Sequence, residues 1–584
     1  MAEYNNPQNE PGSDKRLLLI FLVSFVFMLL AQPLLKKYFP TPPAPQKVAQ
    51  TEQAQPAPPA TKPATTTTVT PSAAAVTKQA TSETETVIES DLYRVTFTNR
   101  GAQVKSWILK KFDNDSEKGP LDLVNPGAAA QYGYPLSLWA YDEELRGKLN
   151  SALYVSTRDG NQITFDYSDQ DLTVHKTIEF DSTYVAKIEA SVTYRGAPKE
   201  TLPAWPSGFG DQGTPAFYAT SLLAYQFNKN IERVPPRCGF SLFSKCTQVV
   251  GGGTIPGPFH WAGPTDQYFA AVFIPDDPAG ASMVTLNHSM PIPKDPQKPQ
   301  DTVNVDVIGA AVGSLHGTVS ERLFVGPKQL DVLQKIPVPG VSGADNDLNG
   351  LVDFGWWKIL AQPLFLWLRW TYHHVVANWG WSIVIQTLII SLALLPLRIS
   401  QMKSMLKMQR VAPQIKSIQE KYKKYSLRDP RKAAMNEEIA ALYKKEGVNP
   451  AGGCLPLIIQ MPFLFAYYRM LSTALDLRHA HWLWIKDLSA PDPIYLLPIL
   501  MVISSLVTQR MTPQAGMDPA QQRMMNVMMP LMMGFIFFRL QAGLNLYYAI
   551  VNLISIAQQA VMNRTSLGRE MREMMAKRAR KKDK

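Results

Sequence analysis

The strongest candidate for a functional residue in this chain is a charged side chain inside an apolar segment. Arg539 lies near the end of the apolar run of residues 523–540. An arginine within a membrane is costly, so it is by default a candidate for a functional site. The alternative is that its long side chain reaches the membrane surface, because only a few residues separate it from the end of the run. The sequence leaves both interpretations of Arg539 open.

A second polar pattern lies on the apolar segment that ends at residue 397. Thr387, Ser391 and Arg398 follow one another at helical spacing, so a helix would place them near one face, with a positive charge at its end. The alternative for Ser391 is a hydroxyl that bonds back to a carbonyl of its own helix. Gln460 and Gln509 lie in other apolar runs and need partners there, either in a groove or on a neighbouring helix.

The rest of the chain offers little that points to catalysis. Residues 84–335 contain scattered charges without paired carboxylates or a catalytic triad, and the chain has no G-x-x-x-x-G-K-[ST] phosphate loop. We therefore predict a protein that is not an enzyme, with no cofactor and no metal. Cys238 and Cys246 lie close together in the sequence and predict a disulfide outside the cytoplasm, with two free thiols as the alternative.

Long apolar runs predict a polytopic α-helical membrane protein. At ~1.5 Å per residue, such runs approach the ~30 Å thickness of the hydrocarbon core. Trp side chains, which favour the membrane–water interface, gather within residues 356–381. We predict six spans, at residues 17–35 (an uncleaved signal anchor), 381–397, 452–471, 493–511, 523–540 and 543–562.

The segments outside these spans differ in character. Residues 36–83 are rich in Pro, Ala and Thr and cannot bury a core, so they predict a tether. Residues 84–335 alternate apolar and polar side chains, which predicts a large all-β sandwich outside the cytoplasm. Residues 346–372 combine several Trp with Arg369, which predicts an amphipathic helix at the membrane surface.

Positive charge predicts the orientation of the chain. The net charge is +11, and residues 402–447 alone hold 12 Lys and Arg against 5 Asp and Glu. By the positive-inside rule, we place the N-terminus (1–16), a basic helical hairpin (399–448) and the basic tail (563–584) in the cytoplasm. The β-domain then lies on the outer side of the membrane, and anionic lipids become expected partners of the basic segments.

Four sequence motifs resemble those of one family of bacterial membrane proteins. They are NWGWSIVIQT at 378–387, NPAGGCLPLIIQMPFLFAYY at 449–468, LWIKDLSAPDP at 483–493 and GLNLYYAIVN at 543–552. With the order of anchor, tether, β-domain, surface helix and five further spans, the chain resembles the YidC-type membrane protein insertases of Gram-negative bacteria. The resemblance covers nearly the whole chain and implies a β-domain like a galactose mutarotase, without that activity.

The resemblance implies a membrane insertase and folding chaperone in the bacterial inner membrane. A polar groove, open to cytoplasm and lipid, would receive nascent membrane proteins, alone or with the Sec translocon. The basic hairpin and tail would meet the ribosome and the signal recognition particle. The expected groove residues are Arg539, Ser391, Thr387, Gln386, Arg398, Gln460, Gln509, Tyr547 and Tyr548. The alternatives are a polytopic transporter, which would often show internal symmetry, and a membrane-tethered carbohydrate enzyme.

The chain departs from the family pattern at two positions. Family members usually carry an Arg five residues before the Pro of the second span, and here that position is Ser391, before Pro396. Arg539 occupies the place before GLNLYY where a Trp is common. We therefore predict that Arg539 supplies the positive charge that is missing at position 391. Arg398 is a second source of this charge, although we expect it at the cytoplasmic interface.

Overall fold

The computed structural model describes residues 77–566 with gaps, together with residues 569 and 573. The gaps are residues 116–118, 211–220, 229, 239–246, 295–298, 316–317, 341–346, 423–424, 426–429, 448–454, 512–529 and 532. The predicted anchor, most of the tether and Cys246 therefore lie outside the described residues, as do parts of the third and fifth predicted spans. Cys238 is described, and it is disulfide-bonded.

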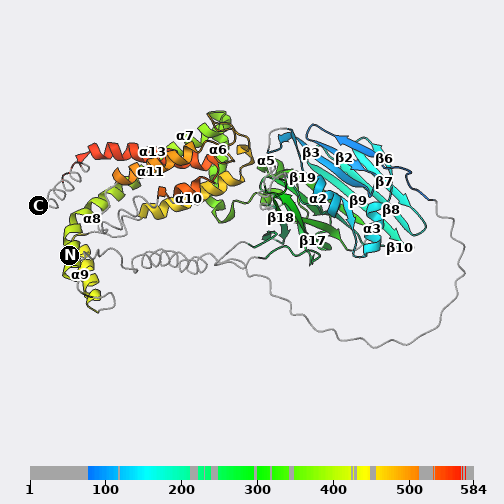
Figure 1. The fold of residues 1–584 in the computed structure, drawn as a ribbon, viewed down its shortest axis with the longest axis horizontal. Helices are drawn as coiled ribbons and strands as arrows, with labels where there is room; N and C mark the ends of the chain where they lie inside the picture. Colours follow the sequence, from blue (N-terminus) through cyan, green and yellow to red (C-terminus); the bar gives the residue numbers. More distant parts are fainter. Residues whose placement is uncertain are drawn as a thin grey trace, which may run out of the picture. The chain divides into compact units, whose positions relative to one another are not determined.

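Antiparallel strands form the first part of the described chain (Figure 1). A four-stranded sheet has the order β1 (Glu85–Glu89), β2 (Tyr93–Thr98), β3 (Gln103–Asp113), β4 (Pro120–Asp122). A five-stranded sheet has the order β14 (Thr254–Pro256), β17 (Ala281–Pro293), β18 (Thr302–Ser314), β11 (Leu202–Trp205), β5 (Ser137–Trp139). The largest sheet has the order β13 (Asn230–Val234), β12 (Leu222–Phe227), β15 (Phe259–Thr265), β16 (Phe269–Pro275), β19 (Val319–Pro327), β9 (Val185–Tyr194), β8 (Leu172–Phe180), β7 (Gln162–Ser168), β6 (Val155–Asp159), with β10 (Ala197–Pro198) paired to β9.

The two larger sheets pack face to face. Strand β18 of the five-stranded sheet contacts β12, β15, β16 and β19 of the largest sheet. Burial alternates along β8, as expected when successive side chains point to opposite faces of a sheet. Leu172, Val174 and Phe180 point inward, and so does Lys176, which is completely buried. The helices of this domain are short: α2 (Pro126–Tyr132), α3 (Glu143–Ser151) and α5 (Leu330–Leu333).

Helices form the second part of the described chain. They are α6 (Lys358–His374), α7 (Trp379–Ala393), α8 (Leu395–Lys421), α9 (Arg431–Lys445), α10 (Leu455–Thr473), α11 (Leu496–Met511) and α13 (Ala542–Arg564). Helix α13 packs against α7 and α11, α6 packs against α7 and α10, and α8 packs against α9 (Figure 1). In the part of the chain that the structure describes, no helix combines the length and the apolarity needed to cross a membrane.

Two helix boundaries differ from the sequence predictions. Only Lys358–His374 of the predicted surface helix is α-helical; two short 3₁₀ helices, Leu348–Leu351 and Gly355–Trp357, precede it. Helix α8 begins at Leu395 rather than after residue 398, so Arg398 lies in its first turn. Pro396 explains this boundary, because proline fits the first turn of a helix, where its missing N–H costs no hydrogen bond.

Candidate functional site

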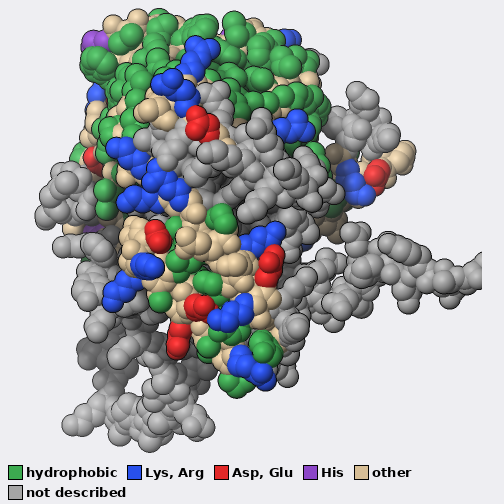
Figure 2. Space-filling model, turned by 90° about the vertical axis from the view of Figure 1, so that its left-hand side faces the viewer, with side chains coloured by type: hydrophobic (Ala, Val, Ile, Leu, Met, Phe, Trp, Pro, Cys, Tyr) green, Lys and Arg blue, Asp and Glu red, His purple; other side chains and the backbone are tan. Residues whose placement is uncertain are grey.

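The helical part carries apolar side chains on its outer surface. On α7 these include Leu388, Ile389 and Leu392, and on α11 they include Ile503, which is 53% exposed. Figure 2 shows hydrophobic side chains gathered over one broad area of the face in view. A large exposed apolar surface marks contact with a membrane or with another protein. Polar side chains on the same helices must therefore find partners inside the bundle.

Arg398 lies in this interior, partly buried, at the start of α8. Its Nη1 donates a hydrogen bond to Ser555 Oγ of α13 at 2.6 Å, and Ser555 Oγ in turn donates to the Val551 carbonyl at 2.6 Å. Beside this pair, Gln558 Nε2 of α13 donates to the Ser391 carbonyl of α7 at 3.3 Å. Polar groups of three helices thus meet where α7 ends and α8 begins.

Helical periodicity brings the α13 residues of this site together. Val551, Ser555 and Gln558 are four and three residues apart, so they lie near one face, and α13 packs against α7. Among the described residues, no carboxylate forms an ion pair with Arg398. The hydrogen bond of its Nη1 goes to a neutral hydroxyl, so within the described part of the chain no acidic group neutralises the charge of this partly buried arginine. A segment that offers a carboxylate or carbonyl groups would satisfy it.

Aromatic rings form one wall of the interior. Tyr547 of α13 stacks on Tyr467 of α10, with ring centroids 4.0 Å apart and planes 14° apart. Tyr548 meets Phe537 edge to face at 4.7 Å. Tyr547 is almost fully buried, so its ring packs within the core of the bundle in this state. Thr387 Oγ1 donates to the carbonyl of Ile383 in its own helix at 2.6 Å, as buried hydroxyls of helices often do.

The other predicted groove residues lie elsewhere. Gln386 is fully buried and its Nε2 donates to the Leu364 carbonyl at 2.9 Å, so it joins α7 to α6. Gln509 lies on α11 and has an interaction partner. The side chain of Gln460 lies outside the described residues. Arg539 is exposed in the turn before α13, and its guanidinium lies 5.8 Å from the ring centroid of Phe535, which is also exposed. The role of Arg539 at the membrane stays a prediction.

Sequence reasoning missed the polar residues of α13. Besides Ser555 and Gln558, Asn552 Nδ2 donates to Ser505 Oγ at 2.9 Å and to Ser504 Oγ at 3.2 Å, which joins α13 to α11. The signal that could have found them is an amide or hydroxyl recurring every three or four residues along an otherwise apolar helix.

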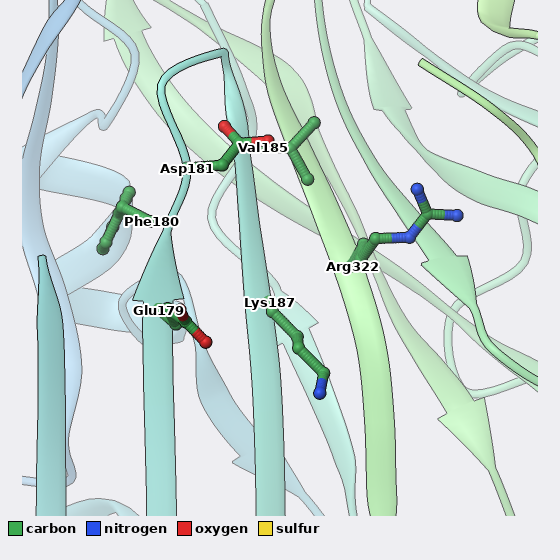
Figure 3. Close-up of a pocket in the computed structure, with 6 residues that line it drawn as sticks. All are labelled: Glu179, Phe180, Asp181, Val185, Lys187 and Arg322. Atoms are coloured by element: carbon green, nitrogen blue, oxygen red, sulfur yellow. The ribbon is translucent and has the colours of Figure 1, made fainter.

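The β-domain has a surface pocket of a different kind (Figure 3). The pocket is lined by Glu179, Phe180, Asp181, Val185, Lys187 and Arg322. Its two carboxylates do not converge in Figure 3, and its cations are already engaged. Lys187 Nζ lies 2.6 Å from Glu189, and Arg322 Nη2 donates to the Pro337 carbonyl at 2.9 Å. Within the described residues, no three His, Cys, Asp or Glu side chains are grouped to hold a metal.

Comparison with known proteins matches both parts of the chain. Residues 370–569 match the family model described as 60Kd inner membrane protein, and residues 85–367 match the one described as YidC periplasmic domain. The membrane protein insertase YidC of Geobacter sulfurreducens is 31% identical over 498 residues, which cover 82% of this chain and 86% of that protein. The chain belongs to the YidC family of membrane protein insertases.

Some YidC proteins match more closely in sequence but over a shorter stretch. The YidC insertase of Cupriavidus necator is 40% identical over 331 residues, covering 56% of this chain and 55% of that protein. The chain thus spans about half the length of this relative in the matched region. A crystal structure of an active YidC insertase with its first transmembrane domain resolved is 19% identical, covering 84% of this chain and 94% of that one, with a TM-score of 0.35. The family expectation drawn from the sequence motifs is confirmed: a β-domain that matches the YidC periplasmic-domain model precedes a helical region that matches the 60Kd inner membrane protein model.

Proposed function

We propose that this chain inserts and assembles integral membrane proteins in the bacterial inner membrane, through the polar interior around Arg398. The observation that carries the proposal is a partly buried guanidinium whose described partner is a neutral hydroxyl, Ser555 Oγ, at 2.6 Å. This cation lies between helices whose outer faces are apolar. Membership of the YidC family supports the same function.

The physical reason is the cost of moving polar groups through hydrocarbon. A polar backbone or charged side chain in lipid loses its water and costs several kcal/mol, roughly 2–7 for one unpaired polar group. The Arg398 charge and the α13 hydroxyl and amides offer replacement partners to a short polar segment on its way across. The apolar helix of the substrate then partitions into lipid, which drives the reaction without a nucleotide.

The proposed topology follows the predicted segments. The spans are residues 17–35, 381–397, 452–471, 493–511, 523–540 and 543–562, with both ends of the chain in the cytoplasm and the β-domain in the periplasm. The exposed apolar residues of α7, α11 and α13 support contact with lipid. The excess of Lys and Arg in residues 399–448 and 563–584 supports their cytoplasmic side.

The proposed partners follow from function and charge. Substrates are nascent membrane proteins, delivered directly or through the Sec translocon. The basic hairpin, α8 with α9, is proposed to meet anionic lipids, the ribosome or the signal recognition particle, because Lys and Arg side chains attract phosphate groups at short range.

Insertion of a small single-span coat protein tests the proposal, in cells that lack their own insertase and carry this chain. We expect Arg398→Leu to reduce insertion by roughly tenfold or more, because a charge-assisted hydrogen bond contributes about 1.5–3 kcal/mol. Arg398→Lys keeps the charge and should retain much of the activity. Arg539→Leu is the matched control and should insert like the unmodified chain.

Equal amounts of each variant in the membrane are required for this comparison. If Arg398→Leu inserts as well as the unmodified chain, the role of Arg398 is refuted. If Arg539→Leu alone fails, the earlier prediction holds and Arg539 supplies the charge that position 391 lacks.

A further inference from the structure

The segment of residues 474–492, between α10 and α11, contacts the first turn of α13. The Ala542 N–H donates to the Ala490 carbonyl at 2.7 Å, and the Gly543 N–H donates to the Leu488 carbonyl at 2.8 Å. The first N–H groups of a helix have no partner within the helix, so these carbonyls satisfy them. The 474–492 segment therefore caps α13 at the end opposite the Arg398 site, because α13 runs from Ala542 past Ser555.

The same segment contacts the start of α7. Asn378, the residue before α7, donates from Nδ2 to the His481 carbonyl at 3.1 Å. Trp482 lies directly on Gly380, where a Cβ would approach the indole Cδ1 to 2.1 Å. Only glycine allows this approach, and the Trp482 ring also meets Trp381 with centroids 5.8 Å apart. The segment thus bridges the corresponding ends of α7 and α13.

The backbone of the segment adopts a conformation that needs outside support. His479 and Leu483 have φ values of 57° and 49°, in the left-handed region that side chains with a Cβ rarely occupy. Such residues are strained and persist where surrounding contacts hold them. Leu483 contributes little to this support itself, since 66% of its surface is exposed.

The support comes in part from the β-domain, through Arg478. Its side chain is only 5% exposed, and its Nε and Nη2 donate to Asp115 Oδ1 at 3.1 and 2.5 Å. The guanidinium also lies 5.7 Å from the ring centroid of Phe269. The Phe269 ring and the Asp115 carboxylate lie against this buried guanidinium, and burial is the setting in which an arginine ion pair contributes most.

The turn between β15 and β16 presents the matching surface. Asp266 Oδ1 accepts from the Tyr268 and Phe269 N–H groups, both at 2.7 Å, which fixes the turn. Gln267, at its tip, donates from Nε2 to the Ser472 carbonyl at the end of α10 at 2.7 Å. The β-domain therefore contacts the chain on both sides of residue 474.

We propose that the 474–492 segment is the outer closure of the helical bundle, and that Arg478 is the positioning residue through which the β-domain holds it shut. The closure covers the ends of α7 and α13 that lie opposite the Arg398 site. It gives the β-domain a part in insertion that involves no chemistry of its own. The role of this closure in insertion rests on the proposed function, but the contacts by which Arg478 holds the segment in place do not.

Hydrogen exchange of the full-length protein in lipid nanodiscs tests the closure directly. The Ala542 and Gly543 amides report the bonds to Ala490 and Leu488. In Arg478→Gln we expect these two amides to exchange roughly tenfold faster, as removal of a charge-assisted bond at a local contact predicts. Amides further along α13 and within the β-domain should keep their rates.

Three further variants distinguish positioning from general packing. Asp115→Asn removes the same ion pair from an exposed loop residue and should accelerate the same amides, while Arg478→Lys should restore slow exchange in part. Arg195→Gln is the matched control, because Arg195 also pairs with a carboxylate, Glu144 at 3.5 Å, and lies over the Tyr194 ring at 4.7 Å, within the β-domain. It should leave Ala542 and Gly543 unchanged.

Unchanged exchange of Ala542 and Gly543 in both Arg478→Gln and Asp115→Asn overturns the proposal. This outcome is independent of the insertion assay on Arg398 variants. A failed closure can therefore be told apart from a failed insertase assignment.

Discussion

Lys176 is an amine in the middle of the β-domain core, and a pH titration of domain stability tests whether it is buried uncharged. It occupies an inward position of β8 with none of its surface exposed. Its Nζ donates to the carbonyl oxygens of Ala102, at 2.8 Å, and Leu136. Burial disfavours the ammonium form, which lowers the pKa of Lys176 from 10.5 to about 7.

The direction of the pH dependence follows from this difference. Between about pH 7 and 10.5, the unfolded chain holds a proton on Lys176 that the folded chain has lost. The contribution of Lys176 to the free energy of unfolding therefore rises with pH across this window and is flat below it. At about 1.4 kcal/mol per pH unit, the rise has an upper limit of about 5 kcal/mol, of which about 3 fall between about pH 7 and about pH 9.5.

Pulse proteolysis in urea measures this stability in the full-length protein in detergent. Lys176→Met removes the titrating group with little change in length and shape. We expect the midpoint for loss of the β-domain to shift upward with pH in the unmodified protein and in the exposed control Lys199→Met, but not in Lys176→Met. An upward pH slope that survives in Lys176→Met would refute the reasoning, because another group would then carry it.

Two further predictions concern polar groups that are buried or partly buried. Glu321 is fully buried, and neither carboxylate oxygen has a partner among the described residues. Burial raises the pKa of Glu321 well above 4.5, so the β-domain should lose stability as the pH rises above 4.5. Glu321→Gln should remove this pH dependence in the same proteolysis assay. An unchanged pH dependence in Glu321→Gln would contradict the prediction. Asn552 joins α13 to α11 through Ser504 and Ser505. Asn552→Leu should therefore lower the free energy of unfolding of the helical part by about 1–3 kcal/mol, seen as a lower thermal midpoint, and an unchanged midpoint would show that these bonds contribute nothing net.

The family and the order of the parts could be predicted from sequence, because motifs such as NPAGGCLPLIIQMPFLFAYY are long and specific. The period of two along residues 172–180 likewise predicted a strand, and β8 occupies these residues. Arg398 was expected at the end of a polar stripe near the cytoplasmic interface, and the structure places it partly buried against Ser555. The number of membrane spans and the side of the membrane on which each segment lies stay predictions.

Pairings between distant residues could not be predicted in this way. Gln386 was expected in the groove, yet its amide bonds the Leu364 carbonyl, because the rotation of α7 turns this side chain toward α6. Arg478 lies in the segment that connects α10 to α11, and its partner Asp115 lies 363 residues away in the β-domain. No local pattern carries such information, since the approach depends on how whole elements pack.

The sequence by itself determined which residues are apolar at which period, and hence the strands, the helices and the family. These follow from local rules, because side chains alternate across a strand and recur every three to four residues along a helix. Only the tertiary structure decided which polar groups share an interior: Arg398 with Ser555, Asn552 with Ser505, and Arg478 with Asp115. The physical reason is that a hydrogen bond is decided within a few tenths of an ångström, and that precision arises only when packed helices and sheets fix each other's rotation and register.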